Sequence, residues 1–149
     1  MKDRIRTLQP AVDVAHEREH AAARQHAQAR ARLDEQRVRL EQLLAFRAEY
    51  AERLHQDGRG GLSARRLHDY LVFIGNLDAN IAQLRRQIEV HELEVAHARK
   101  AWQASRAKAR ALAEVIAHYR RESGRLEERR EQAASDEFAL QKHRDRQVP

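Results

Sequence analysis

Five residues near the start of the chain, H-E-R-E-H at positions 16–20, have the types and spacing of a zinc-peptidase helix. In the H-E-x-x-H motif, two histidines one helical turn apart bind zinc and the glutamate activates a water molecule. His16 and His20 are four residues apart, so on a helix they share one face. A catalytic zinc site also needs a third ligand and a cleft. The motif therefore has chemical meaning only if the rest of the chain can build that cleft.

The composition indicates long helices and not a pocket-forming domain. Charged residues make up 35% of the 149 residues and aromatic residues 5%, and the chain has five glycines and two prolines. Few turn residues and many helix formers are typical of long helices, and clusters of strand-forming residues are absent. We therefore expect an all-α protein that is not an enzyme, with no catalytic residue, no cofactor and no metal site.

The cellular compartment is predicted from three absences in the sequence. The chain contains no cysteine, which excludes thiolate metal sites and suits a reducing compartment. No apolar run approaches the roughly 20 residues of a membrane-spanning helix, and the first ten residues lack the apolar region of a secretory signal. These features predict a soluble cytoplasmic protein.

The strongest break in the helical pattern is D-G-R-G-G at residues 57–61, which holds three of the five glycines. Glycine ends helices at little steric cost, and Ser63 can cap the helix that follows. Pro10 is tolerated in the first turn of a helix. The sequence therefore predicts a single coiled-coil domain over residues 1–149, with a helix over about 7–56, a hinge at 57–62 and a helix over about 63–143.

Apolar residues recur with a heptad spacing along both expected helices. Alternate steps of three and four residues from Leu67 to Leu140 meet mostly apolar side chains, and a weaker seam runs from Leu8 to Leu54. A sustained repeat of 3.5 residues is typical of coiled coils, and a hinge of about five residues makes the helices antiparallel if they pair within one chain. We expect an antiparallel coiled-coil hairpin whose second helix is longer and overhangs the first.

The zinc motif is better explained by this architecture than by catalysis. The seam of the first helix runs through Ala15, Glu19 and Ala22, so His16 and His20 flank a coiled-coil face. A two-helix rod has no second layer that could enclose a metal or exclude water. We interpret the motif as helix surface.

Aromatic residues gather near the hinge. With the turn centred near residue 59 or 60, Phe46 faces Phe73, Tyr50 faces Tyr70, and Leu43 and Leu77 face each other one turn farther away. A strip on one flank of the hairpin would then consist of Leu43, Phe46, Tyr50, Phe73 and Leu77. Two interpretations remain open, because the phenylalanine rings either widen the core near the turn or form a docking patch.

The net charge of +6 is unevenly distributed. Residues 99–112 carry five basic groups and no acid, namely Arg99, Lys100, Arg106, Lys108 and Arg110. Elsewhere acids and bases alternate, which is typical of a solvated helix. The basic stretch is a candidate contact for an acidic partner, and a solvated face is the simpler alternative.

Four stretches of the chain together resemble the FliJ family of flagellar type III export proteins. They are L-x-x-F-R-x-E-Y at 43–50, D-Y-L-V-F-I-G-N-L at 69–77, K-A-W at 100–102 and S-D-E-F-A-L-Q at 135–141. The resemblance covers nearly the whole chain. Three positions depart from the family's pattern, because Arg39, Asn80 and Leu84 stand where a glutamine, a small residue and a histidine are common.

The resemblance implies a non-catalytic component of the flagellar export apparatus that is cytoplasmic and peripherally associated with the inner membrane at the flagellar base. The family's coiled coil resembles the central stalk of rotary ATPases. It associates with the hexameric export ATPase, contacts the cytoplasmic domain of the export gate and binds substrate-free export chaperones. By position, the gate contact would be the strip that contains Phe46 and Phe73. The ATPase contact would lie away from the hinge, where the basic 99–112 stretch is a candidate.

Two other function classes remain as alternatives. A generic coiled-coil scaffold would self-associate through seam residues that the hairpin leaves uncovered. A basic coiled coil could also bind nucleic acid, but the acids interleaved through most of the chain and the lack of a recognition fold argue against this class. We expect no nucleic-acid partner.

Overall fold

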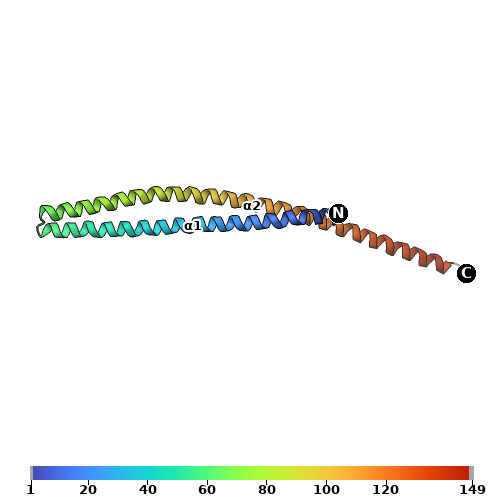
Figure 1. Cartoon of the computed structure of the whole chain (residues 1–149). Helices are drawn as coiled ribbons and strands as arrows, with labels where there is room; N and C mark the ends of the chain where they lie inside the picture. Colours follow the sequence, from blue (N-terminus) through green and yellow to red (C-terminus); the bar gives the residue numbers. More distant parts are fainter. Residues whose placement is uncertain (1, 148–149) are drawn as a thin grey trace. The chain divides into compact units, whose positions relative to one another are not determined.

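The computed structural model describes residues 2–147, and nearly all of them lie in two helices (Figure 1). Helix α1 spans Lys2–Arg59 and has 58 residues, and helix α2 spans Ala64–Gln147 and has 84. Segments of α1 and α2 pair as the arms of a hairpin, and α2 is the longer helix. The prediction of an all-α antiparallel hairpin is therefore confirmed.

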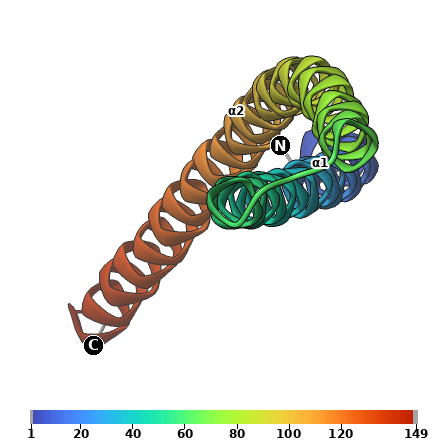
Figure 2. The same cartoon turned by 90° about the vertical axis from the view of Figure 1, so that its left-hand side faces the viewer.

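The contacts divide the chain into two compact units, which we describe separately. The hinge unit is Ala21–Trp102 and includes the turn, which faces the viewer in Figure 2. The end unit combines the start of α1, as far as His20, with the part of α2 that begins at Gln103. Each unit is a segment of α1 packed against a segment of α2.

The turn between the helices is shorter than the hinge predicted from the sequence and begins three residues later in the chain. It comprises residues 60–63, with Gly61 at a φ of 88°, a left-handed conformation that glycine adopts without strain. The backbone N–H of Gly61 donates to the carbonyl of Gly58 at 3.3 Å. The hydroxyl of Ser63 accepts from the N–H of Arg66 at 3.2 Å, which is the expected cap at the start of α2.

A carboxylate in the last turn of α1 links this helix to the start of α2. Asp57 accepts a hydrogen bond from the hydroxyl of Tyr70 and lies 3.5 Å from the guanidinium of Arg66. An acid near a helix C-terminus and a base near a helix N-terminus are each unfavourable toward the helix dipole. Their mutual attraction across the turn offsets part of both effects.

Helix α1 also begins earlier than expected, so Pro10 lies inside the helix and not in its first turn. Contacts with α2 stabilise the residues before the proline. Lys2 forms an ion pair of 3.3 Å with Glu127, and the guanidinium of Arg4 lies 5.7 Å from the ring centroid of Tyr119. These contacts offset part of the roughly 3 kcal/mol that a proline costs in a helix interior.

Burial follows the heptad seam along both helices. Every seam position from Leu8 to Leu54 in α1, and from Tyr70 to Ser123 in α2, is buried or half-buried. In the hinge unit the core is a cluster of Leu33, Leu84 and Ile88, against which Leu40, Leu43 and Val95 pack. In the end unit the buried side chains are Val12, Ala15, Ala109 and Ile116. From Leu126 onward the seam positions are exposed.

The register of the pairing differs from the expected one. Tyr50 was expected opposite Tyr70, yet its ring centroid lies 4.4 Å from that of Phe73, about one turn farther along α2. The cause is the position of the turn, because α1 ends three residues later than the pattern placed its end. A later turn moves the partner of each α1 residue toward the C-terminus of α2.

Within the described residues, neither helix has a stretch with the length and apolar character that a membrane span requires.

Leu84 tests whether this narrow seam stabilises the hinge unit. Leu84 is 5% exposed in the core cluster, whereas Leu93 on the same helix is 71% exposed. We expect Leu84→Ala to lower the free energy of unfolding by ~2 kcal/mol or more through lost burial and a cavity. Leu93→Ala should change it by less than about 0.5 kcal/mol. Urea unfolding followed by circular dichroism measures both, and equal effects would contradict the assigned core.

Candidate functional site

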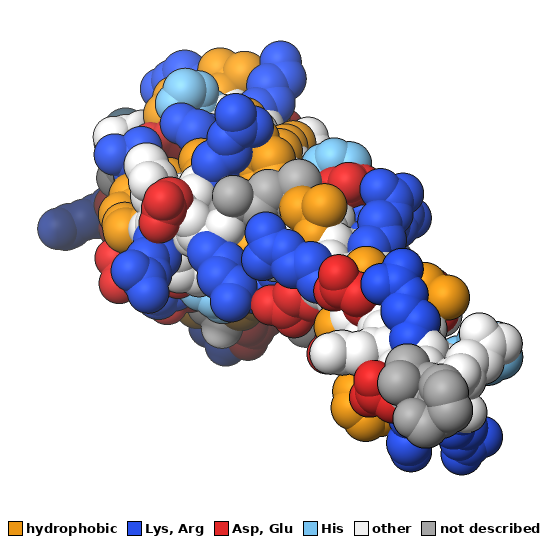
Figure 3. Space-filling view, turned by 90° about the vertical axis from the view of Figure 1, so that its right-hand side faces the viewer, with side chains coloured by type: hydrophobic (Ala, Val, Ile, Leu, Met, Phe, Trp, Pro, Cys, Tyr) orange, Lys and Arg blue, Asp and Glu red, His pale blue; other side chains and the backbone are white. Residues whose placement is uncertain are grey.

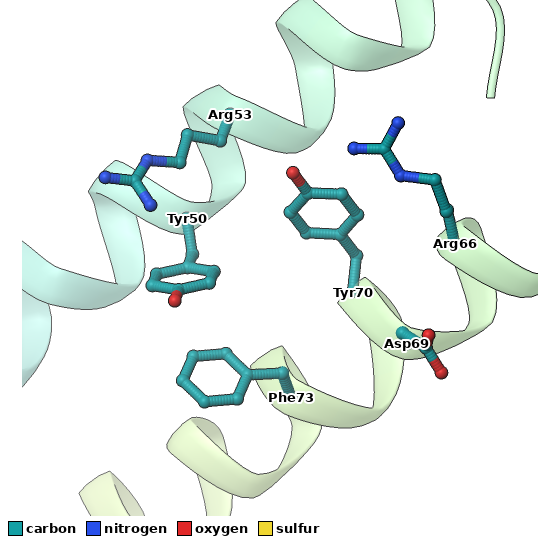
Figure 4. Close-up of a pocket in the computed structure, with 6 residues that line it drawn as sticks. All are labelled: Tyr50, Arg53, Arg66, Asp69, Tyr70 and Phe73. Atoms are coloured by element: carbon teal, nitrogen blue, oxygen red, sulfur yellow. The ribbon is translucent and has the colours of Figure 1, made fainter.

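Three aromatic rings form a cluster across the two helices of the hinge unit. The centroid of Phe73 lies 4.4 Å from that of Tyr50 and 6.2 Å from that of Phe46, and Phe46 and Tyr50 are 5.0 Å apart. In Figure 4 Tyr50 projects from α1 and Phe73 from α2 toward each other. The contact between Phe46 and Phe73 agrees with the sequence-based pairing. We call the predicted strip of Leu43, Phe46, Tyr50, Phe73 and Leu77 the aromatic flank.

The five residues of the aromatic flank are not equally accessible. Phe46 and Phe73 are 42% and 37% exposed despite their contact, and Tyr50 is half-buried. Leu77 is only 6% exposed and belongs to the core, and Leu43 is half-buried against the core cluster. The surface open to a partner therefore consists mainly of the three rings. The rings extend the core near the turn and also remain exposed, so the docking patch stays a prediction.

An open hollow with cationic side chains adjoins the rings on the hinge side. Its lining residues are Tyr50, Arg53, Arg66, Asp69, Tyr70 and Phe73 (Figure 4). The guanidinium of Arg53 lies 5.3 Å from the ring centroid of Tyr50 and donates to Glu49 at 2.9 Å. The hydrogen bond to Asp57, with burial as a second cause, raises the pKa of Tyr70 above its usual value. Tyr70 therefore keeps its proton, and the hydroxyl stays a donor that fixes this side of the hollow.

A second, mostly polar hollow lies on the other side of Leu43. Its lining residues are Arg39, Leu43, Asn80, Gln83, Leu84 and Gln87. The three positions that depart from the family's usual pattern all line this hollow. The aromatic flank is thus bordered by polar side chains on the side away from the turn.

Next to the rings, an ion pair joins the helices in a way that the sequence pattern did not reveal. Arg47 donates through Nε and Nη2 to the two carboxylate oxygens of Asp78, the second at 3.2 Å. Hydrogen bonding from Arg47 lowers the pKa of Asp78 below its usual value, and the same bond raises the pKa of Arg47. Arg47 occupies a position of the α1 seam at which the heptad pattern predicts an apolar residue. A search for acids flanking the opposite seam would have indicated its partner.

The basic stretch lies on α2 with all five side chains exposed. Arg99 and Lys100 belong to the hinge unit, and Arg106, Lys108 and Arg110 belong to the end unit. Four of the five, namely Arg99, Lys100, Lys108 and Arg110, have no ion pair or hydrogen bond within residues 2–147. These four charges are available to a partner.

The H-E-R-E-H stretch lies on the exposed surface of α1. His16 and His20 are both exposed, and Nδ1 of His16 lies 3.8 Å from a carboxylate oxygen of Glu19. Among the described residues, no group of three or more histidine and carboxylate side chains is arranged to hold a metal ion.

The fold and the site define a two-helix hairpin of the coiled-coil class with exposed rings beside its turn. The family model for flagellar FliJ protein matches residues 4–148, so the chain belongs to this family. No curated protein and no solved structure matches the chain. Family membership confirms the resemblance seen in the sequence and makes the chain a component of flagellar protein export.

The ion pair between Arg47 and Asp78 predicts a pH dependence of stability. Because the pKa of Asp78 is lowered in the fold, its contribution is present above the usual pKa of an aspartate and is lost as pH falls through the folded pKa. We expect Asp78→Asn to lower the thermal midpoint at neutral pH and to lose this effect in acid, once the wild-type carboxyl is protonated as well.

Asp34→Asn is the matched control, because Asp34 is exposed and forms no ion pair within the described chain. A difference between wild type and Asp78→Asn that stays constant from neutral to acid pH would contradict the assigned pair.

Proposed function

We propose that this chain is a non-catalytic coupling protein of the flagellar export apparatus that contacts both the export gate and the export ATPase. The observation that carries the proposal is the ring cluster of Phe46, Tyr50 and Phe73, exposed beside the turn of a family member. Clustered exposed aromatic side chains on a narrow rod are unfavourable in water, and such side chains are enriched among the residues that dominate binding energies.

The gate contact is assigned to the aromatic flank because the rings are held by both helices. Phe46 and Tyr50 come from α1, and Phe73 comes from α2. Their mutual contacts and the neighbouring ion pair of Arg47 with Asp78 fix the rings before a partner arrives. A preorganised aromatic surface loses little conformational entropy on binding, which favours affinity.

The ATPase contact is assigned to the basic residues of the 99–112 stretch and to the chain ends. Arg99 and Lys100 in the hinge unit, and Lys108 and Arg110 in the end unit, have no ion pair within the described chain, and exposed cations of this kind complement an acidic protein. Family resemblance supports the hexameric export ATPase as that protein and adds substrate-free export chaperones as further partners. The same resemblance supports a cytoplasmic location with peripheral association at the flagellar base.

The gate contact predicts that removing the two exposed phenylalanine rings weakens binding. We expect Phe46→Ala with Phe73→Ala to weaken affinity for the cytoplasmic domain of the gate by at least about tenfold, because aromatic anchors carry a large share of interface energy. Isothermal titration calorimetry at two salt concentrations is the measurement. Affinity for the gate domain should depend little on salt, since the contact is mostly apolar. A contact made mainly by charges would weaken steeply as the salt concentration rises.

Phe138→Ala is the matched control for this experiment, because Phe138 is also an exposed aromatic residue of α2 and is 65% exposed. It should leave gate affinity unchanged. If the double variant keeps its helix content and its gate affinity, the aromatic flank is not the gate contact.

The ATPase contact predicts a charge-dependent association. Neutralising the four unpaired cations with Arg99→Gln, Lys100→Gln, Lys108→Gln and Arg110→Gln should weaken association by roughly tenfold at low salt. The control removes equal charge from exposed positions of the hinge unit away from the stretch, with Arg32→Gln, Arg65→Gln, Arg85→Gln and Arg86→Gln. Surface plasmon resonance against the ATPase hexamer reports both. Equal losses would show a general charge effect and would reject the specific contact.

A further inference from the structure

Polar contacts between the two helices recur at heptad intervals. In the end unit, Lys2 lies 3.3 Å from Glu127. One heptad later in α1 and one heptad earlier in α2, Gln9 accepts a hydrogen bond from Arg120 at 3.5 Å. A step of seven residues is two helical turns, so it moves both partners equally along an antiparallel coiled coil. Residues one heptad from a known contact therefore occupy the next layer of the same flank.

The same step in the hinge unit brings two arginines into one layer. Arg37 of α1 and Glu92 of α2 lie 3.6 Å apart. Arg30 is one heptad before Arg37, and Arg99 is one heptad after Glu92. Both arginines are exposed and belong to the hinge unit, so they face each other across the two helices. Like charges at facing positions are unfavourable, so this layer destabilises the free hairpin.

No acid among residues 2–147 neutralises this layer. Neither Arg30 nor Arg99 has an ion pair or a hydrogen bond within the described chain. Asp34 is the one acid within a helical turn of Arg30 on α1, and it forms no ion pair there. The side chains one turn from Arg99 on α2 carry no acid, and they are Val95, Ala96, Trp102 and Gln103. Two guanidinium groups are therefore available to an anion from outside the chain.

We propose that Arg30 and Arg99 together form a binding site for two carboxylates of an acidic protein segment. A guanidinium group binds a carboxylate through two parallel hydrogen bonds, so one acid for each arginine neutralises the layer. Binding also removes the repulsion between the two arginines. The site adds a residue of α1 to the contact proposed for Arg99, and it does not depend on which acidic protein supplies the segment.

Acids near the layer favour a short protein segment over a continuous polyanion. Toward the turn, Asp34 follows Arg30 by one helical turn and Glu92 lies two turns from Arg99. Acidic side chains also lie among the basic ones on the surface seen from the C-terminal end of α2 (Figure 3). A nucleic acid carries a phosphate at every nucleotide and would bring further negative charges against these acids. A segment with two acids meets only the two arginines.

The only tryptophan of the chain lies beside this site and reports its occupancy. Trp102 follows Arg99 by three residues, and its ring stacks on that of His26 with centroids 5.5 Å apart. His26 precedes Arg30 by four residues. Both spacings place the stacked rings one helical turn from the arginines on the same side of each helix. A segment bound to the arginines therefore changes the surroundings of the indole.

Binding is tested by titrating the full chain with a hexaglutamate peptide at low salt and following tryptophan fluorescence. Arg30→Gln with Arg99→Gln should weaken peptide affinity by roughly tenfold, because two charge-assisted contacts are lost. Arg32→Gln with Arg86→Gln is the matched control, since it removes the same charge from exposed residues of the same unit that have no ion pair within residues 2–147. Equal losses in the two variants, no binding by the wild type, or tighter binding of a single-stranded hexanucleotide would overturn the proposal.

Charge reversal tests whether the two arginines share a layer. Arg99→Glu should weaken peptide binding and also raise the thermal midpoint by about 2 °C, because the layer becomes an ion pair like that of Arg37 with Glu92. Arg30→Glu with Arg99→Glu restores a like-charge layer and should lose this gain. Arg86→Glu makes the same change in net charge and should give no gain. If Arg99→Glu raises the midpoint, measured by circular dichroism, no more than Arg86→Glu does, the arginines do not face each other and the proposal is wrong.

Discussion

The structure depends on one constraint, which is that two narrow apolar seams bury each other along an antiparallel pair of helices. An apolar stripe on a helix needs a surface that removes it from water, and along most of this chain each helix provides that surface for the other. The buried side chains are almost all on this seam, and none of the residues classed as buried in the described chain is polar or charged. The seam brings Phe46 and Tyr50 of α1 next to Phe73 of α2, so the aromatic flank exists only while the pairing holds.

Polar contacts set the register that the seam alone leaves undetermined. A heptad seam can slide by one repeat and still bury apolar residues, whereas specific ion pairs cannot. Asp57 contacts Arg66 and Tyr70 across the turn, and Arg47 binds Asp78 beside the rings. These exposed pairs each contribute little to stability. Their main effect is to select one alignment and thereby the neighbours of each aromatic ring.

The heptad seams could be predicted from the sequence because periodicity follows directly from side-chain type, and burial agrees with them from Leu8 to Leu54 and from Tyr70 to Ser123. The register could not be predicted, because it depends on where α1 ends. The glycines at 58, 60 and 61 predicted an end near residue 56, whereas α1 continues to Arg59 and includes Asp57 with its contacts to Arg66 and Tyr70. The contact of Phe46 with Phe73 was predicted correctly since two large rings reach across a small error in alignment. The ion pair of Arg47 with Asp78 was missed because a charged seam residue was counted only as a deviation.

The functional account has one central claim, which is that the aromatic flank beside the turn touches the export gate. The most direct measurement is site-specific photo-crosslinking, with benzoylphenylalanine placed at Phe46 or Phe73 in the full chain and Phe138 as the control position. The account predicts crosslinks from both flank positions to the cytoplasmic domain of the gate, and none from position 138. Absence of a gate crosslink at both flank positions, while the folded chain still binds the gate, would contradict it.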